Sequence, residues 1–188
     1  SLLRRYAAVA VIGAPVWAVV GIFITFTVEF ARDFGMTATP DTGMAILSQN
    51  LGLAIGIIAI GALSQRWHSR RRATAFFLAS TILATLLFVL VRPDALPLYY
   101  IFCGLLGLSI GYWAMAVQIG AEQFGTNLRA TVTTSVPNVV RALAIPATLL
   151  FRFLIPGLGV TWAGASVVLI SIAIALAALY TLRETFHA

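Results

Sequence analysis

The sequence predicts an all-α, polytopic membrane protein with six transmembrane helices. Of its 188 residues, 61% are hydrophobic and only 10% are charged, whereas soluble domains are about 45–50% apolar and about 25% charged. The mean hydropathy of +0.99 points the same way. The apolar runs are long and continuous, as in membrane helices of roughly 20 residues, and they lack the alternation of a transmembrane barrel. This composition excludes a soluble globular domain, a disordered chain and a disulfide scaffold.

Short segments rich in Arg, Asp, Pro or Gly divide the chain into six apolar runs. Each run can cross a hydrocarbon core of about 30 Å at ~1.5 Å per residue. We expect one six-helix domain, 1–188, with spans at about 6–28, 43–65, 73–91, 96–121, 128–151 and 160–182. Because the chain opens on Ser1 and enters its first apolar run almost at once, we also expect that it is a fragment of a longer protein.

The basic residues predict the orientation in the membrane. All 12 are arginines, and the formal net charge is +6. One side of the predicted bundle holds Arg4, Arg5, Arg66, Arg70, Arg71, Arg72, Arg129 and Arg183, and the other holds Arg32, Arg92 and Arg152. The positive-inside rule places the richer side, with both termini, in the cytoplasm. Because these charges lie between apolar runs and are not clustered on a soluble face, we interpret them as determinants of topology, and we expect no nucleic-acid partner. The use of arginine alone favours a bacterial inner membrane.

Polar residues are distributed unevenly among the six spans. Spans three and six hold only small hydroxyl side chains, whereas spans two, four and five carry amides or charges. The third helix of each triplet is thus the most lipid-like. This pattern predicts two inverted three-helix repeats, an arrangement typical of secondary transporters.

Span five, 128–151, carries a polar stripe that includes an arginine at mid-span. Its polar residues are Thr131, Thr134, Asn138, Arg141 and Thr148, followed by Arg152. This spacing places them on one helical face. Lipid can accept the opposite valine- and leucine-rich face but not this polar one. A central Arg costs about 2.5–3.5 kcal/mol on insertion scales. Arg141 must therefore face a partner, a backbone carbonyl or a water-filled cavity.

Two interpretations of Arg141 stay open. It could hold an anionic or hydrogen-bonding group of a substrate, or it could form a structural ion pair with an acid outside these six spans. The flanking Pro137 and Pro146 fit either moving hinges or static kinks, because each removes a helical hydrogen bond. The candidate substrate-binding residues are Arg141, Asn138, Thr134, Gln118 and Trp113. Trp113 could stack on a solute or pack against a neighbour.

Glycines in spans two and four predict close helix packing. Gly52 and Gly56, and likewise Gly107 and Gly111, form G-x-x-x-G pairs, which allow helix backbones to approach closely.

The stretch 107–111 also matches G-x-S-x-G around Ser109, which raises an intramembrane serine protease as a remote alternative. The histidines, His68 in the arginine-rich loop and His187 near the C-terminus, are not placed to take a proton from Ser109. No His, Cys and carboxylate cluster has metal-ligand spacing, so we expect neither enzyme chemistry nor a metal or other cofactor.

Three stretches of the sequence resemble the carboxyl-terminal six helices of the major facilitator superfamily. The stretch 61–71, GALSQRWHSRR, is similar to the loop signature G-x-L-x-D-R-x-G-R-R, with Gln65 in place of the acid. The stretch 122–131, EQFGTNLRAT, is similar to E-x-F-P-T-x-x-R-A-T, with Gly125 in place of the proline. The stretch 182–185, LRET, resembles the P-E-T sequence that follows the last helix of sugar-porter-like members.

The resemblance implies helices seven to twelve of a twelve-helix secondary transporter that moves a small solute by alternating access. The missing amino-terminal half would be its partner, spans one and four would line the cavity, and spans three and six would face lipid. Matching residues in the family form a cytoplasmic gate, here Arg66, Glu122 and Arg129. Proton coupling stays open, because Glu29 and Glu122 lie at span ends. The alternative is a stand-alone six-helix carrier that acts as a homodimer.

Overall fold

The computed structural model describes residues 2–124, 126–182 and 184, and within them every regular element is a helix. In chain order these elements are α1 (Leu2–Val19), a π-helical turn (Val20–Ile24), α2 (Thr27–Asp33), α3 (Thr42–Trp67), α4 (Arg70–Val91), α5 (Leu96–Ser109), a 3₁₀ turn (Ile110–Tyr112), α6 (Trp113–Gln123), α7 (Thr126–Ala142) and α8 (Ala144–Thr181). Five helical stretches of the described residues are long and apolar enough to cross a membrane. The all-α, multi-pass class predicted from composition is confirmed.

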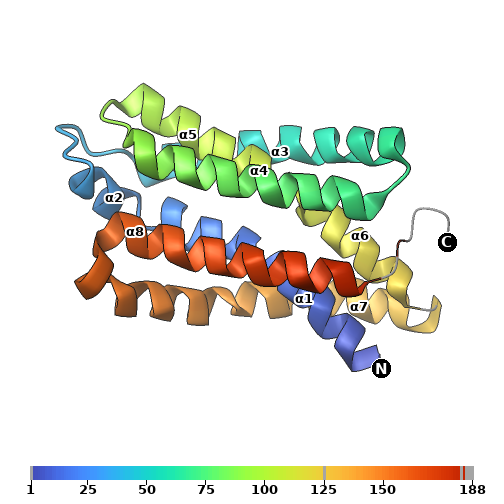
Figure 1. The fold of residues 1–188 in the computed structure, drawn as a ribbon. Helices are drawn as coiled ribbons and strands as arrows, with labels where there is room; N and C mark the ends of the chain where they lie inside the picture. The colour runs from blue at the N-terminus through green and yellow to red at the C-terminus, as the bar shows by residue number, and fades with distance from the viewer. Residues whose placement is uncertain (1, 125, 183, 185–188) are drawn as a thin grey trace.

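The last of these five stretches contains two passes. It runs from Leu128 to Thr181, over 54 residues. Gly159 interrupts it with φ 75° and ψ 168°, a conformation that glycine adopts without the steric clash of a Cβ. In Figure 1 the chain turns back within α8, so the two parts of this helix are antiparallel. Span five therefore comprises α7 and the first part of α8, and span six follows Gly159.

The predicted glycine pairs face each other where α3 packs against α5. A Cβ added to Gly56 would lie 2.3 Å from the Leu108 carbonyl oxygen, and one added to Gly107 would lie 2.0 Å from the Gln49 carbonyl oxygen. Distances this short leave no room for any side chain, so the two backbones are in direct contact. The prediction of close packing through these glycines is confirmed.

The helix contacts agree with two three-helix repeats. Span four packs against span two through α5 and α3, and span one packs against span five through α1 and α7. Spans three and six meet through α4 and α8. Exchange of the first triplet with the second interchanges the contact of spans two and four with that of spans one and five, and it maps the contact of spans three and six onto itself.

The two ends of the bundle differ in chemistry. At the end that carries the termini, Arg5 donates to the Gln123 carbonyl and Arg70 pairs with Glu122. At the opposite end, Asp33 accepts a hydrogen bond from Thr161 and pairs with Arg92, whose guanidinium also lies over the Phe34 ring. Beneath that second cluster, the helices pack through buried aromatic rings that contact one another: Phe23, Phe30, Phe88, Tyr99 and Phe151. Arg5 and Arg70 therefore lie at one end and Arg92 at the other, on the sides that the sequence predicted, whereas Arg183 lies outside the described residues.

Apolar side chains cover most of the exposed helix faces. Span three exposes a stripe of large residues at helical spacing: Phe76, Leu83, Leu87 and Leu90. Span six exposes Trp162, Ile170, Ile174 and Tyr180. These stripes agree with the expectation that spans three and six face lipid. Helix α3 also has a largely exposed apolar surface, with Leu51, Ile55 and Ile58 on it.

Candidate functional site

The polar stripe of span five lies on the surface of the described bundle. Thr131, Thr134, Asn138 and Arg141 are all exposed on α7. The opposite apolar face, which lipid could accept by its sequence, is covered in part by another helix. Val132, Val136 and Val140 are buried, and Val140 packs over Gly13 of α1, where its methyl groups leave no room for a Cβ. Val139 and Leu150 on the same face are exposed. The burial of an apolar face depends on which neighbouring helix covers it, and α1 covers this part.

Arg141 contacts an aromatic ring of span one. Its guanidinium carbon lies 5.0 Å from the centre of the Trp17 ring, within the range of a cation–π interaction. Neither of the ion pairs found among the described residues involves Arg141. The buried Trp17 Nε1–H has no hydrogen-bond acceptor within that part of the chain. Arg141 and Trp17 thus place a cation and an unsatisfied donor side by side.

A break in the helix lies directly after Arg141. Helix α7 ends at Ala142 and α8 begins at Ala144. Pro146 has no N–H to donate, so the helical ladder is interrupted at this turn. Pro137, in contrast, lies within the continuous helix α7. The proline after Arg141 therefore coincides with a change in helix geometry, and the proline before it does not.

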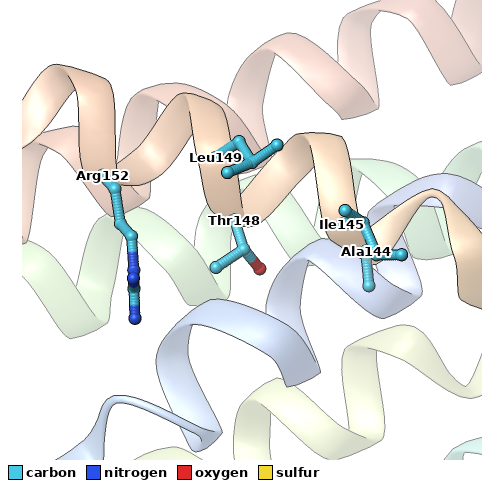
Figure 2. Close-up of a pocket in the computed structure, with 5 residues that line it drawn as sticks. All are labelled: Ala144, Ile145, Thr148, Leu149 and Arg152. Carbon is cyan, nitrogen blue, oxygen red and sulfur yellow. The ribbon is translucent and has the colours of Figure 1, made fainter.

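A cavity of about 300 Å³ continues the polar face beyond this break. Its lining is Ala144, Ile145, Thr148, Leu149 and Arg152. Figure 2 shows these residues on successive turns of α8, with Thr148 and Arg152 projecting from the same side of the helix.

The π-helical turn of span one lies across from this cavity. A Cβ at Gly21 would lie 3.8 Å from the side chains of Ala144 and Thr148, which is ordinary van der Waals contact, so the two helices lie side by side there. The Arg152 guanidinium carbon lies 5.8 Å from the centre of the Phe26 ring. Span five therefore offers two arginines, and each lies over an aromatic ring of span one or of the segment that follows it.

The two predicted site residues of span four lie apart from this face. The side chain of Trp113 is half-buried, and its ring lies 2.7 Å from the position of a Cβ at Gly13, so it packs against α1. Gln118 is exposed, and its Nε2 donates to Glu122 Oε1 over 3.5 Å. Neither residue lines the cavity beside Arg152.

No ion pair or hydrogen bond found among the described residues joins the predicted gate residues Arg66, Glu122 and Arg129 to one another. Glu122 pairs with Arg70, with Arg70 Nη2 2.7 Å from Glu122 Oε1. Arg66 is exposed and makes no ion pair with Glu122. Arg129 Nε donates to the Ala121 carbonyl near the end of α6, over 3.3 Å. Arg70 follows Arg66 by four residues, but the left-handed His68 (φ 48°) ends α3 between them, so the two arginines belong to different helices.

The C-terminal stretch contributes an interaction that the sequence did not predict. The Glu184 carboxylate accepts hydrogen bonds from Ser69 Oγ and from the backbone N–H groups of Arg70 and Arg71. A carboxylate at a helix N-terminus accepts hydrogen bonds from the free N–H groups there, and its negative charge is attracted to the positive end of the helix dipole. Glu184 therefore ties the region after span six to the start of α4, next to the Arg70–Glu122 pair.

Ser109 does not have the geometry of a nucleophile. It is buried, and its hydroxyl donates to the Leu106 carbonyl over 2.7 Å. His68 lies in the loop that ends α3, and His187 lies outside the described residues.

Sequence reasoning missed Trp17 and did not single out Arg152 and Phe26. Trp17 lies in an apolar run, where an aromatic residue is usual, so nothing within that run distinguishes it. An aromatic residue in one span at the depth of an arginine in another was the signal that could have found it.

Comparison with known proteins identifies the fold. No family model and no curated protein match the chain. The structure is similar to the crystal structure of an auto-inhibited POT family peptide transporter, with a TM-score of 0.67 over 96% of this chain. Over nearly its whole length, the chain has the same fold as one part of that transporter. Sequence identity is 14%, and the chain spans 36% of that transporter's length, so the likeness concerns the fold.

Proposed function

We propose that this chain is a six-helix half of a secondary transporter, which moves a small solute by alternating access together with an amino-terminal half. The observation that supports this most is the exposed polar face around Arg141. It lies on a bundle whose other exposed helix faces are largely apolar. An intramembrane cation that faces neither lipid nor an acid marks a solute path by default.

The substrate we propose is a small solute with a carboxylate or another anionic group. Guanidinium groups bind such groups through paired hydrogen bonds. Arg141 and Arg152 are eleven residues apart on span five, which corresponds to about 16 Å along a helix. The Thr148 hydroxyl, which lines the same cavity as Arg152, supplies a neutral donor. A short peptide, the cargo named for the structurally similar transporter, carries a suitable carboxylate.

We further propose that Arg70 and Glu122 belong to a gate at the end of the bundle that carries the termini, which we expect to be cytoplasmic. Within the described residues, Arg70 Nε and Glu122 Oε2 are buried without partners. A buried polar atom without a partner costs about 1–3 kcal/mol. A pair that is incomplete in this way stabilises one state weakly and can be released when the transporter changes state.

The alternative is a six-helix carrier that functions as a homodimer. In that arrangement, the exposed face around Arg141 would meet a second copy of itself. Two like-charged arginines would then approach across the dimer axis unless a solute anion neutralised them. Dimers that form only when solute is present would favour this alternative.

Uptake by the intact protein tests the proposed function. A thermal-shift screen of small carboxylates, short peptides and sugars first identifies a solute, which is then used in proteoliposomes. Arg141→Ala should lower uptake by about 10- to 100-fold, since a hydrogen bond to a charged group contributes about 1.5–3 kcal/mol. Arg141→Lys should recover only part of it. Arg72→Ala, which removes an exposed arginine from the loop region, is the matched control. Normal uptake by Arg141→Ala would refute the proposal.

A further inference from the structure

Two cavities lie along one seam between α1 and the last part of α8, away from the face around Arg141. The first, of about 250 Å³, is lined by Arg4, Arg5, Thr181 and Leu182. The second, of about 270 Å³, lies deeper in the bundle and is apolar, with a further wall from the first part of α8. Its lining on the two seam helices includes Val11, Ala14, Ala18, Val167, Ser171 and Ile174.

The two cavities share the same helix faces. Arg4 and Val11 are seven residues apart on α1, which is close to two helical turns, so they lie on one face. Thr181 and Ile174 have the same separation on α8. At ~1.5 Å per residue, both helices place the near end of the apolar cavity about 10 Å from the polar one. The seam therefore changes from cationic at its end to apolar at depth.

We propose that this seam binds an anionic phospholipid, with the phosphate at Arg4 and Arg5 and an acyl chain in the apolar cavity. Guanidinium groups form paired hydrogen bonds with phosphate, and basic pockets between membrane helices bind anionic headgroups. Arg5 donates one N–H to the Gln123 carbonyl over 3.4 Å, which leaves most of the five donors of a guanidinium.

The charge of this end of the bundle supports the assignment. Besides Arg4 and Arg5, the described residues place five further arginines there, Arg66, Arg70, Arg71, Arg72 and Arg129, against two acids, Glu122 and Glu184. This excess of positive charge favours the binding of an anionic lipid more than that of a zwitterionic lipid.

The dimensions of the seam also fit a lipid. One leaflet has a hydrocarbon depth of about 15 Å, half of a ~30 Å core. A chain anchored at the arginines therefore reaches a cavity that begins about 10 Å away. Ile170 and Ile174 beside the cavity are 49% and 54% exposed, so the cavity opens sideways toward the surrounding bilayer. The apolar cavity is also lined by Leu143, Pro146 and Ala147, which follow Arg141 on span five, but Arg4 and Arg5 lie on α1 and are not part of the polar stripe. Lipid binding at the two arginines can therefore be tested without a transport assay.

Lipid retention by the intact protein tests the proposal directly. Native mass spectrometry from detergent should show at least a tenfold preference for phosphatidylglycerol over phosphatidylcholine with the same acyl chains. Inorganic phosphate should not raise the melting temperature at concentrations where phosphatidylglycerol does. Equal retention of the two lipids would overturn the proposal. Equal stabilisation by phosphate would show a site for a free anion instead, and would overturn it as well.

A phosphatidylglycerol with a photoactivatable acyl chain locates the site. We expect labelling of 11–18 and 167–174, reduced at least tenfold in the double variant Arg4→Gln and Arg5→Gln. The matched control, Arg66→Gln and Arg72→Gln, removes the same charge from exposed positions at the same end and should label as the wild type does. Ala14→Leu, which fills the apolar cavity and keeps both arginines, should also reduce labelling. Labelling elsewhere, or an equal loss in both double variants, would overturn the proposal.

Discussion

The guanidinium of Arg141 on span five lies over the indole ring of Trp17 on span one, at 5.0 Å from the ring centre. This contact joins the first helix of one triplet to the second helix of the other. It stabilises the cation without neutralising it, since a ring quadrupole attracts a charge but does not pair with it. The arginine therefore keeps its charge for an anionic solute.

Loss of the Trp17 ring should weaken solute binding. Trp17→Leu removes a cation–π contact that contributes about 0.5–2 kcal/mol, so we expect KM for uptake to rise by roughly 2- to 30-fold. Trp17→Phe, which keeps a ring, should lie between this variant and the wild type. Trp162→Leu, at an exposed position on span six, is the control. Transport by Trp17→Leu with an unchanged KM would show that the contact is structural only.

Release of the Arg70–Glu122 pair should open the bundle at the end that carries the termini. With a reporter cysteine at Asn138 and Cys103→Ser in the background, Glu122→Gln and Arg70→Gln should each speed labelling by a membrane-impermeant thiol probe from that side. We expect an increase of up to about fivefold, because partly exposed ion pairs contribute about 0–1 kcal/mol.

In the same assay, Arg66→Gln distinguishes between Arg66 and Arg70 as the partner of Glu122. Arg66 does not reach Glu122 in this structure, so its variant should label at the wild-type rate. Faster labelling of Arg66→Gln together with a wild-type rate for Arg70→Gln would instead favour the gate that the sequence motif implies.

A methyl group at Gly56 should push α3 and α5 apart. The Cβ would lie 2.3 Å from a backbone oxygen, and overpacking of this kind destabilises by about 1–3 kcal/mol. Gly56→Ala should therefore lower the melting temperature of the intact protein in detergent.

Gly61 on the same helix is the matched control for this substitution. Nothing lies within 4 Å of its Cβ position, so Gly61→Ala should be neutral or stabilising by about 0.5–1 kcal/mol. A fall in melting temperature of the same size for both variants would mean that helix contact is not the cause.

Gly159→Ala should destabilise the turn between spans five and six. At φ 75° and ψ 168°, a conformation that essentially only glycine adopts, a side chain is strained by about 1–3 kcal/mol. Gly157→Ala, two residues earlier and free of neighbours within 4 Å, should not have this effect. The measurement is again thermal unfolding, and equal stability of the two variants would contradict the role of Gly159.

The sequence alone determined the fold class, the number of passes and the glycine contacts. Each of these depends on local properties. An apolar run of sufficient length must be helical in a bilayer, because its backbone hydrogen bonds have to be satisfied within the segment. Likewise, glycines repeat at helical spacing at Gly52, Gly56, Gly107 and Gly111. Because glycine lacks a side chain, this pattern in a membrane helix indicates close packing against another helix.

Only the tertiary structure decided which residues meet. By its sequence, the Val132–Val140 face was acceptable to lipid, and the family resemblance implied a gate of Arg66, Glu122 and Arg129. Both questions depend on how one helix is rotated and placed against another, which hydrophobic periodicity does not encode. The structure buries the valines against α1, places Arg70 on Glu122, and brings Trp17 to Arg141 across 124 residues of chain. Periodicity defines a face on each helix, whereas the packing of all six helices selects the neighbour of that face.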